Sequence, residues 1–275
     1  RRNHTLMKHT LLLVDDFIAR RQQLLAKMPL NSAALVFAAT EVTRSNDTEF
    51  PFCQNKNFYY LTGFNEPEAI LLLIKAASGE SDQTILFCRM KDPLQEVWHG
   101  RRIGPEKAQA DYGVEQAFSL AEADTMIASY LQGKTTLLFC QSEASNVSER
   151  AFHYLAQVQK NARRGDKAPT EFIDCAPMIH EMRLIKSAAE LAVMRQVNHI
   201  SGLAHQRAMR STKAGKFEYQ IEADLLHEFA QHGARYPAYS SIVAGGDNAN
   251  ILHYTDNGEQ LVANDLLLID AGGEL

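Results

Sequence analysis

The sequence predicts two units, an α/β unit followed by an α+β unit. Its 275 residues exceed the length of a typical single domain. Strand-like and helix-like segments alternate up to about residue 161, whereas two amphipathic helices precede the next strands after residue 177. Alternation is typical of a sheet covered by helices, and consecutive helices before strands favour an α+β layer. We place the boundary between the domains 1–176 and 177–275.

In the first unit, Asp16 can cap a helix that places Phe17, Leu24 and Leu25 on one face. The polar residues 78–83 between two apolar segments predict a hairpin loop. The segment 162–170, which is polar and contains Gly and Pro, is the best linker candidate. We expect strands at 33–38, 58–62, 69–75, 84–90 and 135–140, and further helices at 105–113, 120–132 and 147–161.

The second unit begins with a capping box, because Ser187 and Glu190 can each satisfy a free backbone N–H group of the other. A long helix follows and ends before Gly215. Apolar residues then recur every fourth position from Phe217 to Phe229, which predicts a second amphipathic helix ending at Gly233. Strands are expected at 239–243 and 266–270.

The composition excludes several function classes. A net charge of −5 gives no electrostatic reason to expect nucleic acid as a partner. The four cysteines are widely separated and form no CxxC pair, which argues against a zinc ribbon or a disulfide scaffold and favours a reducing cytoplasm. The apolar run 11–14 is too short for a signal peptide or a membrane span. We therefore expect a cytoplasmic protein with no nucleic-acid or membrane partner.

Asp270 is the candidate metal ligand. It ends the apolar run 267–269, and the small residues 271–273 follow it. An ionised carboxylate delivered by a buried strand is costly unless a cation or strong donors meet it. An aspartate that only starts a turn explains the same pattern, so the alternative stays open.

Two other residues are candidates for chemistry or contact. His253 lies between an apolar pair and a tyrosine and could donate a hydrogen bond to a polarised carbonyl, although a packed or surface histidine fits as well. Trp98, the single tryptophan, lies among charged residues and could form a contact. The residues alone favour a tryptophan that covers its own domain core. His227 and Glu228 lack the second histidine of a zincin motif.

Seven segments, in order along the chain, resemble bacterial aminopeptidase P. This family is the Xaa-Pro aminopeptidase branch of the creatinase/prolidase, or pita-bread, superfamily. The resemblance extends from about residue 15 to the end of the chain. The segments are 44–52, 64–68, 97–102, 180–184, 232–239, 251–254 and 268–272.

The resemblance implies a creatinase-like α/β domain followed by the start of an α+β pita-bread domain. It implies an enzyme that removes the first residue from peptides with proline in second position, using two divalent metal ions, usually manganese. Asp270 matches the first metal ligand, and the other ligands would lie beyond residue 275. His253 matches the histidine that contacts the scissile carbonyl, and Tyr239 an aromatic of the substrate pocket.

Trp98 matches a tryptophan that reaches into the active site of a neighbouring subunit. The resemblance therefore favours this role over a tryptophan that covers its own domain core, and it implies a homo-oligomer, a dimer or a tetramer. Because one carboxylate cannot hold two metal ions, we expect this chain by itself to bind no metal firmly and to be inactive. The alternatives are a non-catalytic peptide-binding or oligomerisation module of the same fold, and a prolidase, which cleaves only dipeptides. Methionine aminopeptidase is disfavoured because it lacks such an N-terminal domain.

Overall fold

The computed structural model describes residues 12–141, 143, 146–160, 165 and 167–275. They form two compact units, which we call the N-terminal unit (residues 13–185) and the C-terminal unit (residues 186–275). The sequence places this boundary nine residues earlier, after residue 176. The difference arises because helix α7 (Ala176–Leu184) packs in the N-terminal unit. Its Ile179 is buried, and the carbonyl of Met182 accepts a hydrogen bond from the Tyr60 hydroxyl at 3.1 Å.

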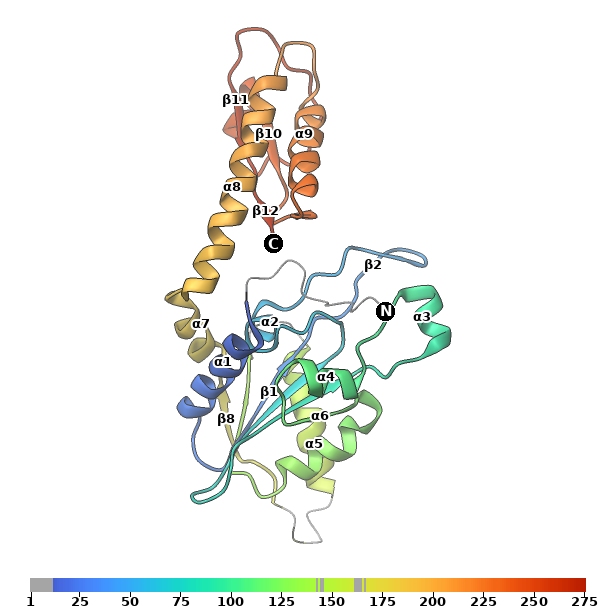
Figure 1. Cartoon of the computed structure of the whole chain (residues 1–275), viewed down its shortest axis with the longest axis vertical. Coiled ribbons are helices and arrows are strands. Elements are labelled where there is room, and N and C mark those ends of the chain that lie inside the picture. Colours follow the sequence, from blue (N-terminus) through green and yellow to red (C-terminus); the bar gives the residue numbers. More distant parts are fainter. Residues whose placement is uncertain (1–11, 142, 144–145, 161–164, 166) are drawn as a thin grey trace. The chain divides into compact units, whose positions relative to one another are not determined.

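The N-terminal unit is built on a mixed six-stranded sheet in the order β6-β5-β4-β1-β7-β8. Strands β1 and β8 of this sheet are labelled in Figure 1. Strands β5, β4 and β1 are antiparallel neighbours, whereas β6, β7 and β8 join by parallel pairing. A small hairpin, β2 (Thr43–Ser45) and β3 (Thr48–Glu49), lies outside this sheet. The strands of the sheet are β1 (Ser32–Phe37), β4 (Ile70–Lys75), β5 (Gln83–Cys88), β6 (Gln116–Ser119), β7 (Thr136–Phe139) and β8 (Glu171–Asp174).

Helices cover both faces of the sheet, which confirms the predicted α/β class. Helices α5 (Ala123–Leu131) and α6 (Val147–Lys160) pack on one face through residues such as Ile127 and Tyr154. Helix α1 (Val14–Lys27) contacts β4, and α2 (Lys56–Thr62) contacts β1. All six residues of β1 are buried, because β1 is central. The remaining helices are α3 (Pro93–His99), α4 (Pro105–Asp111) and the short η1 (Leu120–Glu122).

The predicted strand at 58–62 is wrong, because these residues form α2. The Asn55 side chain accepts a hydrogen bond from the backbone N–H of Phe58 and caps the start of the helix. Gly63, with φ of 66°, ends the helix in the left-handed conformation. These two flanking residues outweigh the strand preference of the aromatic residues between them.

Two further predictions need correction. Asp16 does not precede the first helix but lies inside it, where its carboxylate accepts a hydrogen bond from the backbone N–H of Leu13 at 2.8 Å. The predicted linker at 162–170 lies partly outside the described residues. Because β8 follows it and belongs to the same sheet, the segment connects elements of one unit and not two domains.

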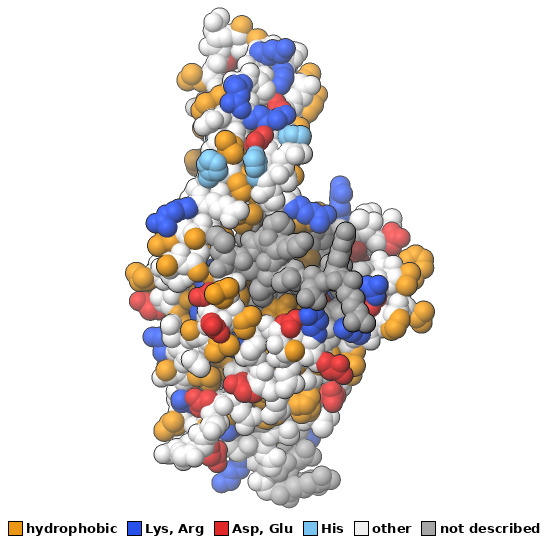
Figure 2. All heavy atoms as spheres, viewed as in Figure 1, with side chains coloured by type: hydrophobic (Ala, Val, Ile, Leu, Met, Phe, Trp, Pro, Cys, Tyr) orange, Lys and Arg blue, Asp and Glu red, His pale blue; other side chains and the backbone are white. Residues whose placement is uncertain are grey.

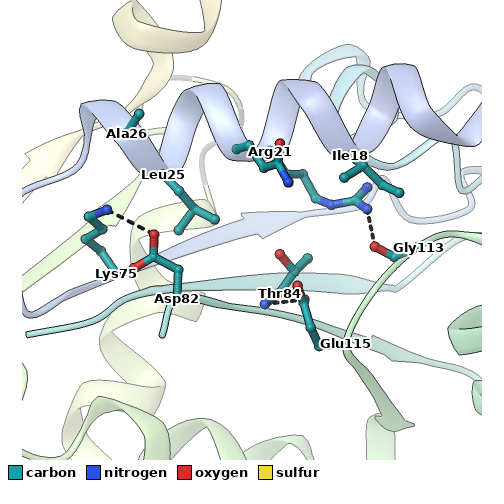
Figure 3. A pocket seen from close by; sticks show the side chains of 10 residues that line it. Ile18, Arg21, Leu25, Ala26, Lys75, Asp82, Thr84, Gly113 and Glu115 are labelled. Carbon is teal, nitrogen blue, oxygen red and sulfur yellow. Dashed lines mark hydrogen bonds and ion pairs between the residues drawn. The ribbon is translucent and has the colours of Figure 1, made fainter. Parts of the chain in front are cut away.

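Arg21 joins α1 to helix α2 and to the turn that follows α4 in the N-terminal unit. Its buried guanidinium donates hydrogen bonds to the carbonyls of Leu61, Tyr112 and Gly113. Burial lowers the pKa of the Arg21 guanidinium to about 10, and the charge of Glu115 opposes this shift. Arg21 and the other residues labelled in Figure 3 line a cavity of about 280 Å³. Because Arg21 is bound by backbone carbonyls, its role is to hold the fold together.

The C-terminal unit packs two helices on antiparallel strand pairs, as predicted. Helices α8 (Ala188–Ser211) and α9 (Glu218–Gln231) share a core with β10, in which Ala204, Leu225 and Val243 are fully buried. The predicted capping box of α8 is present between Ser187 and Glu190. Strand β10 pairs with β11, and β9 with β12. The remaining elements are β9 (Tyr236–Pro237), β10 (Ile242–Gly245), η3 (Gly246–Asn250), β11 (Leu267–Asp270) and β12 (Gly273–Glu274).

Strand β11 differs from the buried strand that the sequence predicts. Its residues alternate between partly buried and exposed positions, and Leu268 and Asp270 are exposed. Within the described residues β11 pairs only with β10, so one edge and one face of the strand are not covered by other described elements. Among all the residues that the structure describes, no helix has the length and apolarity that a membrane span requires.

Candidate metal and substrate site

Tyr239 and Asp270 are brought together by the two strand pairs of the C-terminal unit. Tyr239 lies between β9 and β10, and Asp270 is the last residue of β11. The backbone hydrogen bond from Ala238 to the carbonyl of Gly272 aligns the two segments at 2.9 Å. The Tyr239 hydroxyl then donates a hydrogen bond to Oδ1 of Asp270 at 2.7 Å. Two residues that the sequence identifies separately are therefore direct neighbours.

The hydrogen bond to Asp270 raises the pKa of the Tyr239 phenol, with smaller contributions from burial and from the Asp270 charge. Tyr239 therefore stays protonated and acts as a donor at neutral pH. Gly272 lies beside the ring, since a Cβ at this position would be 3.6 Å from the Tyr239 hydroxyl oxygen. The small residues after Asp270 thus leave room for the tyrosine.

The residues present do not by themselves fit a pair of metal ions. Asp270 is exposed and supplies one carboxylate, of which Oδ1 is bonded to Tyr239. Within the described residues, no group of three or more His, Cys, Asp or Glu side chains could hold a metal ion. Hard divalent ions in proteins take several oxygen ligands. Asp270 can therefore contribute one ligand to such a centre but cannot form it alone.

His253 lies in the turn that follows η3, and its side chain is exposed. It makes no side-chain hydrogen bond within the described part of the chain, so its imidazole is available to an external group. The next residue, Tyr254, is buried and donates a hydrogen bond to Oε2 of Glu218 at 2.7 Å. The backbone at His253 is thus attached to the core through its neighbour.

Trp98 does not cover the core of its own unit. It lies on α3, in which no residue is buried, and its side chain is 82% exposed. Leu94 and Val97 are exposed on the same helix, and the spacing places the three side chains on one face. Figure 2 shows hydrophobic side chains at the right edge of the view, where α3 lies in Figure 1. We call Leu94, Val97 and Trp98 the α3 surface.

Glu66 contacts the segment 89–103, which carries the α3 surface, on both sides of α3. Its Oε1 accepts a hydrogen bond from the backbone N–H of Ile103 at 2.7 Å, and its Oε2 lies 3.9 Å from a guanidinium nitrogen of Arg89. Residues 89 and 103 flank α3 on either side along the chain. The buried carboxylate of Glu66 therefore holds the segment after α3 by a hydrogen bond and faces the segment before α3 through a longer ion pair.

Two buried polar residues of the C-terminal unit, Glu218 and Asn257, are not predicted from the sequence. Glu218 is fully buried, and Asn257 is buried with φ of 46° and bonds to the backbone of Ser241 and Val243. Glu218 lies three residues before Ile221, on the apolar face of α9. A carboxylate on that face was the signal that could have identified it. No comparable pattern marks Asn257.

Comparisons with known proteins match both units. Residues 17–139 match the family described as aminopeptidase P, N-terminal domain, and residues 192–275 match metallopeptidase family M24. The Xaa-Pro aminopeptidase of Escherichia coli is 44% identical over 94% of this chain and 59% of its own length. That of Haemophilus influenzae is 44% identical over 94% of this chain and 57% of its own length.

A solved structure of aminopeptidase P from E. coli with the inhibitor Pro-Leu gives a TM-score of 0.92 at 43% identity, covering 96% of this chain and 60% of that chain. The chain thus spans less than two thirds of the length of these relatives. The two family matches occur in the same order as the two units of the fold. Together with the likeness to the solved structure, they show that this chain belongs to the aminopeptidase P family of M24 metallopeptidases, with an aminopeptidase P N-terminal domain followed by part of a pita-bread domain.

Proposed function

We propose that the whole protein to which this chain belongs is a metal-dependent Xaa-Pro aminopeptidase, which releases the first residue of peptides with proline in second position. The observation that carries the proposal is the match over 94% of the chain to proteins named Xaa-Pro aminopeptidase. The related structure with Pro-Leu supports a peptide substrate that contains proline. We also propose that the protein acts in the cytoplasm, in agreement with four free cysteines, three of them buried.

In this proposal Asp270 contributes one carboxylate to a pair of divalent ions, for which manganese is our choice. The other ligands come from outside the described residues. The Tyr239 hydroxyl donates a hydrogen bond to Oδ1 of Asp270, which orients the carboxylate before a metal ion binds. The ring of Tyr239, which is partly exposed, offers an apolar surface to the proline ring of the substrate.

His253 is the proposed catalytic residue. It donates a hydrogen bond to the oxygen of the scissile carbonyl as that oxygen gains negative charge during attack. Its exposed side chain, free of hydrogen bonds within the described residues, supports this role. An imide bond to proline has no N–H group, so recognition has to come from the ring and from the carbonyl oxygen.

The proposed protein is a homo-oligomer in which the α3 surface contacts a second copy. Three large exposed apolar side chains on one short helix are typical of an interaction site. In this arrangement Trp98 reaches the substrate site of the neighbouring subunit and limits the space beyond the first residue of the peptide.

The test uses the complete protein in manganese-containing buffer and an Xaa-Pro peptide of four or more residues. We expect Asp270→Ala to lower kcat/KM by at least about 100-fold, because a direct metal ligand is lost. Asp265→Ala, at another exposed aspartate of the same segment, is the matched control and should retain wild-type activity. The 275-residue chain alone should not cleave the peptide.

Full activity of Asp270→Ala, or undiminished cleavage after removal of divalent ions, would contradict the metal-dependent mechanism. Cleavage of dipeptides alone would identify a prolidase. Binding of the peptide without cleavage by the complete protein would favour a non-catalytic module.

A further inference from the structure

Glu218 is a buried carboxylate surrounded by four hydrogen-bond donors. Oε1 accepts from the backbone N–H of Gly245 at 2.8 Å and from the Asn248 side chain at 3.1 Å. Oε2 accepts from the Tyr254 hydroxyl at 2.7 Å and from the backbone N–H of Glu259 at 2.9 Å. All four donors belong to residues 245–259, which connect β10 to the segment before β11. We call residues 245–259 the His253 loop, since His253 lies within it.

These bonds hold the loop at both ends and near its middle. Gly245 is at its start, Glu259 at its end, and Tyr254 is the direct neighbour of His253. The Asn248 side chain also donates to the Tyr254 hydroxyl oxygen at 3.0 Å, which links two of the four donors to each other. Glu218 itself is fixed at the first residue of α9, where its backbone N–H donates to the carbonyl of Glu259 at 3.0 Å.

The protonation state of Glu218 suits this role. Burial acts to raise the pKa of its carboxyl, but the hydrogen bonds from Gly245, Glu259, Tyr254 and Asn248 outweigh burial, so the pKa is lowered. The carboxylate is therefore ionised at neutral pH, and each of its oxygens accepts two hydrogen bonds. Charge-assisted bonds of this kind are stronger than bonds between neutral groups.

We propose that Glu218 is a positioning residue, which acts on the substrate through the His253 loop and sets the place of the His253 imidazole. The inference rests on the proposed function, in which His253 contacts the scissile carbonyl. It adds that the loop is preorganised by one internal carboxylate. A donor held in place before the reaction needs no reorganisation as charge develops, so loss of the carboxylate reduces turnover more than substrate binding.

The first experiment uses the 275-residue chain and does not depend on activity. Glu218→Gln keeps the size of the side chain but replaces one acceptor oxygen by an NH₂ group, which cannot accept from two of the four donors. We expect faster amide hydrogen exchange in peptides from residues 245–259, with unchanged exchange in α8. Glu222→Gln, at a partly buried carboxylate one turn along the same helix, is the matched control and should leave exchange unchanged. Unchanged exchange in Glu218→Gln would overturn the proposal.

The second experiment measures kinetics in the complete protein. We expect Glu218→Gln to lower kcat by about 10- to 100-fold, as for other residues that orient a reacting group, with KM changed by less than about threefold. In a His253→Ala background the same substitution should cause no further loss, because its effect passes through His253. An equal loss in both backgrounds would show that Glu218 only supports the fold, and would overturn the proposal.

Tyr254→Phe is the second variant, should Glu218→Gln fail to fold. It removes one donor and keeps the ring. We expect kcat to fall by about three- to tenfold, a smaller loss than for Glu218→Gln because one hydrogen bond is removed, and we expect this loss to depend on His253 in the same way. An unchanged kcat in Tyr254→Phe with an unchanged loop exchange rate would overturn the proposal. If the wild-type complete protein cleaves no Xaa-Pro peptide, the proposed function fails, while the exchange measurement still decides whether Glu218 fixes the loop.

Discussion

Two buried glutamates show how the partners of a residue decide its charge. Glu218 has four donors and a lowered pKa. Glu66 has one backbone donor and a distant guanidinium, and burial raises its pKa despite the hydrogen bond from Ile103 and the charge of Arg89. Its Oε2 and the Nε of Arg89 are buried without a hydrogen-bond partner among the described residues. A buried carboxyl group therefore has a lowered pKa only where hydrogen bonds to the carboxylate outweigh the loss of water.

Glu66→Gln is predicted to change the pH dependence of stability. Because the pKa of Glu66 is higher in the folded state, the folded state holds the proton more tightly. Its contribution to stability is greatest below the ordinary glutamate value of 4.5 and declines as pH rises through the folded pKa. The glutamine variant does not titrate, so its free energy of unfolding relative to wild type should increase from pH 4 to pH 7. Urea unfolding at several pH values measures this difference, with the exposed Glu80→Gln as control. A difference independent of pH would contradict the prediction.

At the scale of elements, the sequence predicts those whose pattern extends over several turns or strands. Helices α8 and α9 and the β4–β5 hairpin follow from apolar periodicity, a capping box and a polar loop. Helix α2 does not, because its five residues 58–62 have strand-like side chains and the decision rests on Asn55 and Gly63. The hydrogen bond between Tyr239 and Asp270 spans 31 residues and depends on strand pairing, which periodicity alone does not fix.

The end of α2 offers a direct test of this interpretation. Gly63 has a left-handed φ of 66°, and a Cβ there would lie 2.6 Å from Cε2 of Phe17, a fully buried ring. Gly63→Ala should therefore combine backbone strain with overpacking and lower the free energy of unfolding by about 2 kcal/mol or more. Gly133→Ala is the matched control, since φ is 76° and nothing lies within 4 Å. It should cost only about 1 kcal/mol. Equal losses in chemical denaturation would rule out the contact with Phe17 as the cause.

At the scale of the whole molecule, both units expose large apolar side chains. The N-terminal unit exposes the α3 surface, and the C-terminal unit exposes Leu252 and Leu266, which are 89% and 84% exposed. Scattered apolar residues on a surface are ordinary, but a tryptophan beside two aliphatic residues on one helical face is a typical interface centre. The hydrogen bond from Ile103 to Glu66 attaches the segment that carries this face to the rest of the unit. The α3 surface is therefore the better candidate for contact between copies.

Mixing two inactive variants of the complete protein tests whether Trp98 acts across such a contact. We expect Trp98→Ala to lose activity because its neighbour's site lacks the indole ring, and Asp270→Ala because its own site lacks a metal ligand. In a mixed oligomer, a site with intact Asp270 on the first variant receives intact Trp98 from the second, so part of the activity should return as subunits exchange. The control is a chain that carries both substitutions, mixed with either single variant. Neither mixture can form a site that has both Asp270 and Trp98, so no activity should return. If Trp98 serves the site of its own chain, no mixture of the single variants recovers activity, and the contact between copies has another role.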